Sequence, residues 1–144
     1  VPLMGGFLQT GENEPGQIRN QCLLQDGLPK VALTSGLDYI LVPKEVWTFL
    51  YDKFQGGPEV AVPIVIDPES GNVVPVIREW ELNVKYQTSQ KRMKTNRYET
   101  IAQFKVKACE IFQTNPEDSR LVDYWNENYI KVLKEELTVG ASQL

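Results

Sequence analysis

A short apolar run followed by an amphipathic segment dominates the first half of the chain. Residues 37–42 are mostly apolar, which is typical of a strand. Pro43 comes next, where its fixed φ and missing N–H suit the first residue of a helix. Gly56 and Gly57 are placed to end that helix. Its apolar face is formed by Val46, Trp47, Leu50 and Phe54.

We expect the helix at residues 43–54 to be the centre of the first unit. A buried Trp or Phe removes ~150–250 Å² from water, and no other helix of the first half carries comparable apolar area. Trp47, Leu50 and Phe54 are therefore predicted core residues. A ligand-binding aromatic pair of Trp47 and Phe54 is the alternative interpretation.

The segments on both sides of this helix contain turn and strand signals. Residues 1–14 predict an irregular arm, and Asn20 is placed to cap a short helical turn over residues 21–24. Residues 60–77 predict a β-hairpin with a bulge or an edge strand at Pro63. Its turn, residues 67–72, lacks the spacing of an EF-hand, so we interpret it as a turn and not as a calcium loop.

The second half alternates strands with one helix. Residues 80–86 alternate apolar and polar positions, a second strand is expected at 93–98, and Thr100 with Gln103 fits a capping box. Two further short strands are expected at 121–125 and 129–133. We predict that one helix face packs on the strands. The helix residues are Ile101, Phe104, Ala108 and Ile111, and the strand residues are Trp80, Leu82, Val84, Leu121 and Trp125.

Composition narrows the functional classes. The chain contains no histidine, so a Cys–His or Ser–His catalytic pair and a His-containing zinc site cannot form within it. Cys22 and Cys109 fall in different halves, which favours a reducing compartment, cytoplasmic or nuclear. We expect no catalytic residue, no metal and no cofactor. Chemistry that uses only lysine, tyrosine and carboxylates is not excluded by these counts.

Charge and hydropathy exclude two kinds of partner. The net charge is −4, with five basic and nine acidic residues in 1–78 and ten of each in 79–144, which argues against a nucleic-acid partner. No apolar run approaches the ~18–20 residues that span a bilayer, and no signal-peptide pattern is visible, so no membrane partner is expected. A basic cluster is interpreted as a solvated face. Its members are Lys91, Arg92, Lys94 and Arg97.

The second half resembles ubiquitin, a β-grasp protein. Thr100-Ile-x-x-Phe-Lys-x-Lys, followed by Asn115-Pro-Glu-Asp-Ser-Arg-Leu121, is similar to the ubiquitin helix, its proline-containing loop and the next strand. Residues 137–144 are similar to the segment that precedes the last ubiquitin strand. The resemblance implies a ubiquitin-like domain at 79–144 that stops before its last strand. Without a C-terminal Gly-Gly it cannot be conjugated as ubiquitin is.

The first half resembles the DUSP domain of ubiquitin-specific proteases. Pro15-Gly-Gln-Ile-Arg-Asn20 is similar to the Pro-Gly-Pro-Ile-x-Asn motif of that family, with Gln17 in place of the second proline. Leu37-Asp-Tyr-Ile-Leu-Val-Pro-x-x-Val-Trp47 is similar to a second motif of the family, Leu/His-Asp-Tyr-x-x-Val/Leu-Pro-x-x-x-Trp. The expected fold is α+β: a DUSP-like helix-plus-antiparallel-hairpin unit at 1–78, without the family's N-terminal helix, and a ubiquitin-like β-grasp at 79–144.

The two resemblances imply a non-catalytic interaction or regulatory region of a ubiquitin-specific cysteine protease. Its expected partners are proteins: the protease's own catalytic domain, substrates or ubiquitin-pathway proteins. The alternatives are a free-standing adaptor with a ubiquitin-like domain and an enzyme without histidine. The candidate interaction residues are Pro15, Gly16, Ile18, Tyr39 and Trp47.

The absent N-terminal helix leaves one face of the helix 43–54 to be covered by something else. Exposed apolar patches beyond a few hundred Å² usually mark an interface. We expect the arm to cover this face, with another chain or a preceding segment as alternatives, so an oligomer through the arm stays open. The apolar residues of the arm are Leu3, Met4, Phe7 and Leu8.

Overall fold

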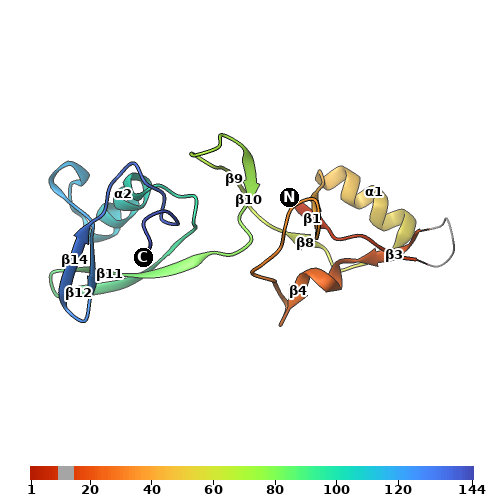
Figure 1. The fold of residues 1–144 in the computed structure, drawn as a ribbon, viewed down its shortest axis with the longest axis horizontal. Helices are drawn as coiled ribbons and strands as arrows, with labels where there is room; N and C mark the ends of the chain where they lie inside the picture. The colour runs from red at the N-terminus through yellow and green to blue at the C-terminus, as the bar shows by residue number, and fades with distance from the viewer. Residues whose placement is uncertain (10–14) are drawn as a thin grey trace. The chain divides into compact units, whose positions relative to one another are not determined.

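The computed structural model describes residues 1–9 and 15–144 and divides the chain into two compact units (Figure 1). Unit 1 consists of Val1–Val65 and Val74–Arg78. Unit 2 consists of Ile66–Val73 and Glu79–Leu144. The segment 66–73 therefore belongs to unit 2, although the chain on both sides of it belongs to unit 1.

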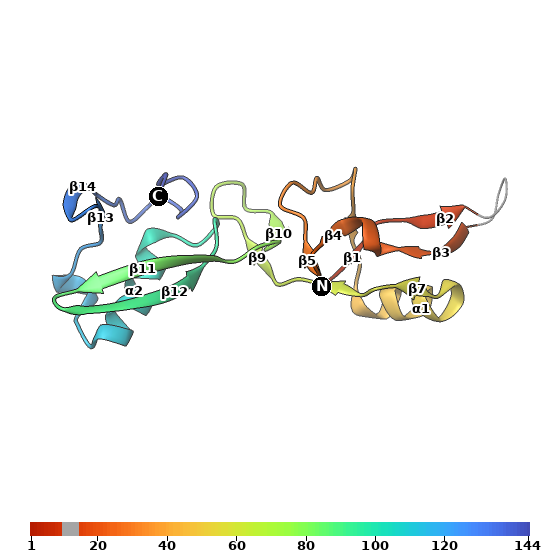
Figure 2. The ribbon, with the colours of Figure 1, turned by 90° about the horizontal axis from the view of Figure 1, so that it is seen from below.

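The described residues of unit 1 form short strands, one 3₁₀ turn and one α-helix. Its elements are β1 (Pro2–Met4), β2 (Phe7–Gln9), β3 (Pro15–Arg19), η1 (Asn20–Leu23), β4 (Leu24–Gln25), β5 (Leu28–Pro29), β6 (Ile40–Leu41), α1 (Lys44–Phe54), β7 (Gly56–Gly57) and β8 (Val60–Ala61). One sheet has the order β6-β1-β8 with antiparallel neighbours. Another has the order β2-β3-β7, in which β3 and β7 run side by side in parallel (Figure 2).

The prediction of an irregular arm is wrong for residues 2–4 and 7–9, which form strands. β1 is the middle strand of its sheet, and pairing on both edges holds it in place despite the two glycines that follow. Leu3 and Met4 are consequently buried. The side chains of Phe7 and Leu8, and the arm residues 10–14, lie outside the part of the chain that the structure describes.

The described side chains of unit 1 form two apolar core clusters. The first contains Leu3, Leu23, Tyr39, Val60 and Val62. The second contains Met4, Ile18, Val42 and Trp47, with Leu50 and Phe54 packed against it. The inner face of α1 therefore meets β1 and β3 through the second cluster, with Trp47 buried and Leu50 and Phe54 half-buried.

The outer face of α1 stays exposed. Val46, expected on the apolar face, is exposed, and Phe49 is 64% exposed. Met4 packs beside Trp47 and so covers the inner face, which means that the expectation of an arm covering the outer face is wrong for the described side chains. The reason is that β1 is held between two strands and cannot reach around the helix. Cover by another chain stays a prediction.

The two ends of α1 differ slightly from expectation. The helix begins at Lys44, and Pro43 precedes it with φ −58°. Gln55 ends it with φ 58°, ahead of the two glycines. Gly56 is required for a different reason: a Cβ at this position would lie 2.4 Å from the Ile18 carbonyl oxygen, because β7 runs directly beside β3.

The prediction that Asn20 caps the short helical turn is wrong, because η1 begins at Asn20 itself and Arg19 occupies the capping position. Asn20 is fully buried, and its side chain bonds to three backbone groups in two segments instead. Its Oδ1 accepts a hydrogen bond from Gly5 N (2.8 Å), and its Nδ2 donates to the carbonyl oxygens of Leu3 (2.8 Å) and Pro58 (3.1 Å). Asn20 thus joins the end of β1 to the loop before β8.

The predicted hairpin within 60–77 consists of β9 (Ile64–Ile66) and β10 (Val73–Pro75). Pro63 separates it from β8, as expected of a residue without a backbone donor. In the turn, Asp67 accepts hydrogen bonds from Ser70 Oγ (2.8 Å) and Glu69 N (3.0 Å). The Ser70 hydroxyl, followed by the Glu69 amide, lowers the pKa of the Asp67 carboxyl. Asp67 therefore stabilises the turn through these hydrogen bonds.

Unit 2 has the order hairpin, helix, hairpin. Its remaining elements are β11 (Trp80–Tyr86), β12 (Ser89–Thr95), α2 (Ile101–Phe112), η2 (Pro116–Asp118), β13 (Val122–Trp125) and β14 (Asn128–Val132). Gln87 and Thr88 make the first turn, so β12 begins four residues earlier than predicted. β11 pairs with β12 and β13 with β14, and no pairing joins the two hairpins among the described residues.

α2 holds the two hairpins together. Phe104 and Ala108 pack with Met93 of β12, against which Leu82, Val84 and Leu121 also pack. Nearer the helix start, Ile101 packs with Leu133 and Val139, again in contact with Leu82 and Leu121. On the same side, buried Lys105 forms a 2.5 Å ion pair with Glu135. Both hairpins thus share one helix face.

Three residues predicted to be in this core are exposed: Trp80 (40%), Ile111 (41%) and Trp125 (73%). Trp80 is the first residue of β11, and the strand positions that pack on the helix lie further along it. Ile111 lies at the edge of the stripe set by the buried positions 101, 104, 105 and 108. Trp125 follows a register shift in β13 and adjoins the hairpin turn.

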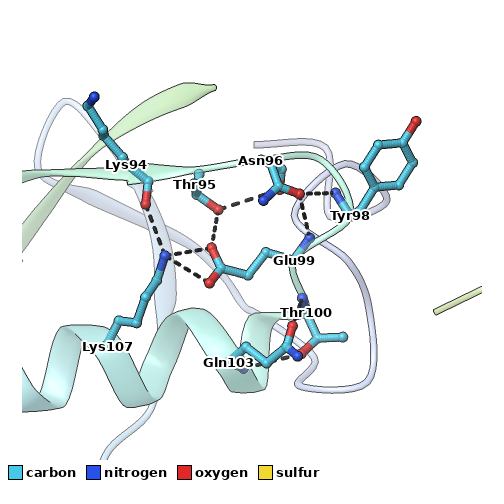
Figure 3. A network of polar contacts seen from close by, with 8 residues as sticks. All are labelled: Lys94, Thr95, Asn96, Tyr98, Glu99, Thr100, Gln103 and Lys107. Carbon is cyan, nitrogen blue, oxygen red and sulfur yellow. Dashed lines mark hydrogen bonds and ion pairs between the residues drawn. The ribbon is translucent and has the colours of Figure 1, made fainter. Parts of the chain in front are cut away.

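A polar network fastens the start of α2 to the end of β12 (Figure 3). The predicted capping box is present: Thr100 Oγ1 accepts from Gln103 N, and Gln103 Oε1 accepts from Thr100 N. The Glu99 carboxylate accepts from the buried Thr95 hydroxyl (2.6 Å) and pairs with Lys107 Nζ (2.8 Å). Lys107 also donates to the Lys94 carbonyl oxygen (3.1 Å).

Glu99→Ala is expected to lower the free energy of unfolding of unit 2 by about 1–3 kcal/mol, because the buried Thr95 hydroxyl loses its short hydrogen bond. Lys107→Ala is expected to cost only about 0.5 kcal/mol, since that side chain is 43% exposed and its charge is screened. Urea denaturation of the two variants measures both values. Equal losses would show that the ion pair, and not the bond to Thr95, provides the stabilisation.

Candidate functional site

The five candidate interaction residues do not form one surface. Ile18, Tyr39 and Trp47 are buried and divided between the two core clusters of unit 1. Their apolar area is used to hold the fold, so the expectation that they contact a partner directly is wrong for Ile18 and Trp47. Pro15 is exposed and Gly16 half-buried on β3, and contact through these two residues stays a prediction.

Tyr39 differs from the other buried residues because it also lines a hollow in the surface of unit 1. The hollow has a volume of about 240 Å³ and is open to solvent. The segment that follows β1 forms one side of it, and the loop leading into β6 forms the other. The lining residues are Met4, Gly5, Gly6, Gly36, Leu37, Asp38, Tyr39 and Ile40. We refer to it below as the glycine hollow.

Local hydrogen bonds fix the loop on one side of the glycine hollow. Asp38 Oδ2 accepts from Thr34 N (2.7 Å), and Asp38 N donates to the Thr34 carbonyl oxygen (2.8 Å). Gly36 N donates to the Tyr39 carbonyl oxygen (2.8 Å), which closes the loop. The closed loop presents Leu37 to solvent with 85% of its surface exposed. Ile40, at the start of β6, is also exposed.

The described lining of the glycine hollow combines apolar side chains with one carboxylate. Asp38 is the one ionisable acid or base among the described lining residues apart from the phenol of Tyr39. In the part of the chain that the structure covers, no three His, Cys, Asp or Glu residues come close enough to hold a metal ion. Apolar side chains with one carboxylate suit the recognition of a protein segment.

Sequence reasoning missed most of this site. It identified Tyr39 but took Leu37 and Asp38 only as parts of a motif, and it assigned Gly5 and Gly6 to an irregular arm. A hollow bordered by glycines leaves no hydrophobic pattern along the chain, because it is formed where side chains are missing. The available signal was an apolar residue, Leu37, between Gly36 and Asp38, two residues that favour turns.

Unit 2 offers a second exposed apolar region on its last hairpin. Trp125 and Tyr129 flank the turn, and Val122, Ile130 and Val132 are exposed along the two strands.

Cys22 is exposed and Cys109 buried, and both are free thiols. None of the described helices is long and apolar enough to cross a membrane.

Comparison with known proteins identifies unit 1. Residues 5–66 match the family model of the DUSP domain. The chain is similar to Ubiquitin carboxyl-terminal hydrolase 5 of Arabidopsis thaliana, with 27% identity over 106 residues that cover 72% of this chain and 12% of that protein. It is also similar to Inactive ubiquitin-specific protease 5 of Oryza sativa subsp. japonica, with 26% identity over 123 residues that cover 77% of this chain and 32% of that protein.

Residues 5–66 are therefore a DUSP domain of the kind found in ubiquitin-specific proteases, as the two sequence motifs predicted. The glycine hollow lies almost wholly within the matched residues, with only Met4 outside them. The chain spans about an eighth and about a third of the length of these two relatives, 12% and 32%.

Proposed function

We propose that this chain is a non-catalytic protein-interaction and regulatory region of a ubiquitin-specific cysteine protease. The observation that carries the proposal is the DUSP match at residues 5–66. The names of the two similar proteins support it: one is a ubiquitin carboxyl-terminal hydrolase and the other an inactive ubiquitin-specific protease. The partners we propose are proteins: the catalytic domain of the same protease, its substrates or other ubiquitin-pathway proteins, in the cytoplasm or nucleus.

We also propose that residues 79–144 are a ubiquitin-like β-grasp domain. The order hairpin, helix, hairpin supports this, as do the capping box at Thr100 and the shared helix face on which both hairpins pack. Backbone amide NMR of this region tests it. In a β-grasp the strands in the positions of β11 and β13 are not direct neighbours, so we expect no cross-strand contacts between them. A direct β11–β13 ladder would contradict the β-grasp.

The proposed role predicts that residues 1–144 do not hydrolyse ubiquitin conjugates. The chain contains no histidine to activate Cys22 or Cys109. We expect no release of fluorophore from a ubiquitin–fluorophore substrate and no adduct with a ubiquitin-based suicide probe in intact-mass measurements. Turnover that persists through purification and is lost in Cys22→Ala or Cys109→Ala would contradict the proposal.

The regulatory role itself is tested in the full-length protein. Deleting residues 1–144 is expected to change its deubiquitinase activity or its choice of substrate without removing the catalytic machinery. A free-standing adaptor is the alternative, which the rice relative named inactive makes relevant. A full-length transcript without a catalytic Cys and His segment would support the adaptor and contradict the protease proposal.

A further inference from the structure

We propose that the glycine hollow binds a short segment of another protein that presents one apolar side chain next to a basic residue. The proposal deepens the interaction role proposed above and rests on it. It names the surface of the DUSP domain that makes contact and the chemistry of the segment that fits there. Three properties of the hollow carry it: its size and apolar lining, its bare glycine backbone, and the carboxylate of Asp38, the one carboxylate among the lining residues that the structure describes.

Size and lining indicate an apolar side chain as the occupant. A volume of about 240 Å³ lies below the ~300–1,000 Å³ of pockets for drug-sized ligands. It is enough for one large side chain and part of its neighbours. Leu37 and Ile40 project apolar surface at the rim, while Met4 and Tyr39 are buried beneath. An apolar anchor between them removes surface from water on both partners.

The glycines leave the backbone of the hollow accessible to a partner. Gly6 and Gly36 have φ values of 122° and 82°, which side-chain-bearing residues rarely adopt. A Cβ built at either position would meet nothing within 4 Å, so both face open space. A partner backbone can therefore approach closely here. This suits an extended peptide better than a bulky folded surface.

The charge of the hollow indicates that a basic residue lies next to the apolar anchor of the partner. Asp38 is held in place by its hydrogen bond from Thr34 N, so its carboxylate stays at the rim. Unit 1 has five basic and seven acidic residues, a net charge of −2, which favours approach of a cationic segment. An arginine or lysine beside the apolar anchor would meet Asp38 and would disfavour acidic competitors.

A phage-displayed random dodecapeptide library selected on residues 1–144 provides the probe. We expect enriched peptides with an apolar residue adjacent to Arg or Lys. A synthetic peptide of the enriched sequence, titrated into ¹⁵N-labelled protein, should shift the amide signals of residues 4–6 and 36–40. Its affinity should weaken when the salt concentration is raised, because an exposed carboxylate contributes to it.

Four variants test whether the peptide binds in the glycine hollow. Leu37→Ser and Ile40→Thr remove rim apolar surface and are expected to weaken the peptide about tenfold, as loss of an anchor contact does. Asp38→Asn retains an acceptor for Thr34 N but removes the charge, and should weaken binding severalfold and reduce its salt dependence. Phe49→Ser is the matched control, because Phe49 is equally an exposed apolar residue of unit 1 but does not line the hollow.

Several outcomes would overturn the proposal. These are the enrichment of acidic peptides, amide shifts centred elsewhere, equal weakening by Phe49→Ser, or the absence of any enriched peptide. A dimer seen by light scattering and dissociated by Leu37→Ser would make a second copy of this chain the occupant instead. Such results leave the regulatory role intact, since that role is judged by deleting residues 1–144 from the full-length protein.

Discussion

Asn20→Ala is expected to lower the free energy of unfolding of unit 1 by about 3 kcal/mol or more. The side chain is fully buried and satisfies Gly5 N, the Leu3 carbonyl and the Pro58 carbonyl. Alanine leaves these groups without their partner, and each buried group that stays unpaired costs about 1–3 kcal/mol. The loss should be specific to unit 1, because all three partners belong to it.

Asn20→Asp tests the same contacts more severely. It keeps an acceptor for Gly5 N, but at pH 7 it directs a carboxylate oxygen at the Leu3 and Pro58 carbonyls in place of a donor. We expect a loss at least as large as that of alanine, although the two side chains have nearly the same shape. This comparison separates hydrogen bonding from packing.

Urea denaturation followed by the fluorescence of Trp47 measures both variants. The other tryptophans, Trp80 and Trp125, are exposed and can be replaced by phenylalanine so that only unit 1 is reported. Gln21→Ala is the matched control on the same 3₁₀ turn, where the side chain is exposed and the expected change is within about 0.5 kcal/mol. A loss below about 1 kcal/mol for Asn20→Ala would show that water replaces its bonds.

Phe104→Ala is expected to lower the free energy of unfolding of unit 2 by about 3–5 kcal/mol, the range for emptying a packed aromatic site. Phe104 is 3% exposed and packs with Met93 and Ala108 between the helix and the first hairpin. The cavity would lie where α2 meets that hairpin. The backbone amides of α2 and of the hairpin β11–β12 should therefore lose their protection from hydrogen exchange together.

Ile111→Ala on the same helix is the control, with an expected loss below about 1 kcal/mol because Ile111 is 41% exposed. Urea denaturation followed by the amide NMR signals of residues 80–112 reports on unit 2 alone. If both variants lost the same amount, the assignment of the inner helix face would be wrong. A loss below about 1 kcal/mol for Phe104→Ala would mean that this residue is not part of the core.

The sequence predicted the elements whose signals are local. The alternation over residues 80–86 and the Thr100–Gln103 box determine a strand and a helix start within a few residues of chain. Burial was harder, because it depends on where the opposing layer ends. Trp80 and Ile111 have the right spacing but lie at the margins of the packed face, and no periodicity reports that margin.

Asn20, whose side chain makes three long-range hydrogen bonds, was wrongly predicted to be a helix cap. A local rule assigns an asparagine before a helical turn to capping. Its actual partners are 15, 17 and 38 residues away in the sequence, and nothing near Asn20 indicates them. The glycine hollow escaped prediction for a related reason: two segments, around residues 5 and 38, form it jointly.

The division of the chain at residues 66–73 has a consequence for synthesis on the ribosome. The DUSP match ends at residue 66, yet Val76 is buried, Ile77 packs against the first core cluster, and Arg78 Nε donates to the Pro29 carbonyl oxygen. Unit 1 therefore cannot complete its core until residue 78 has left the exit tunnel. By then the turn at 67–72 has already emerged, so the first portion of unit 2 is made before unit 1 can finish folding.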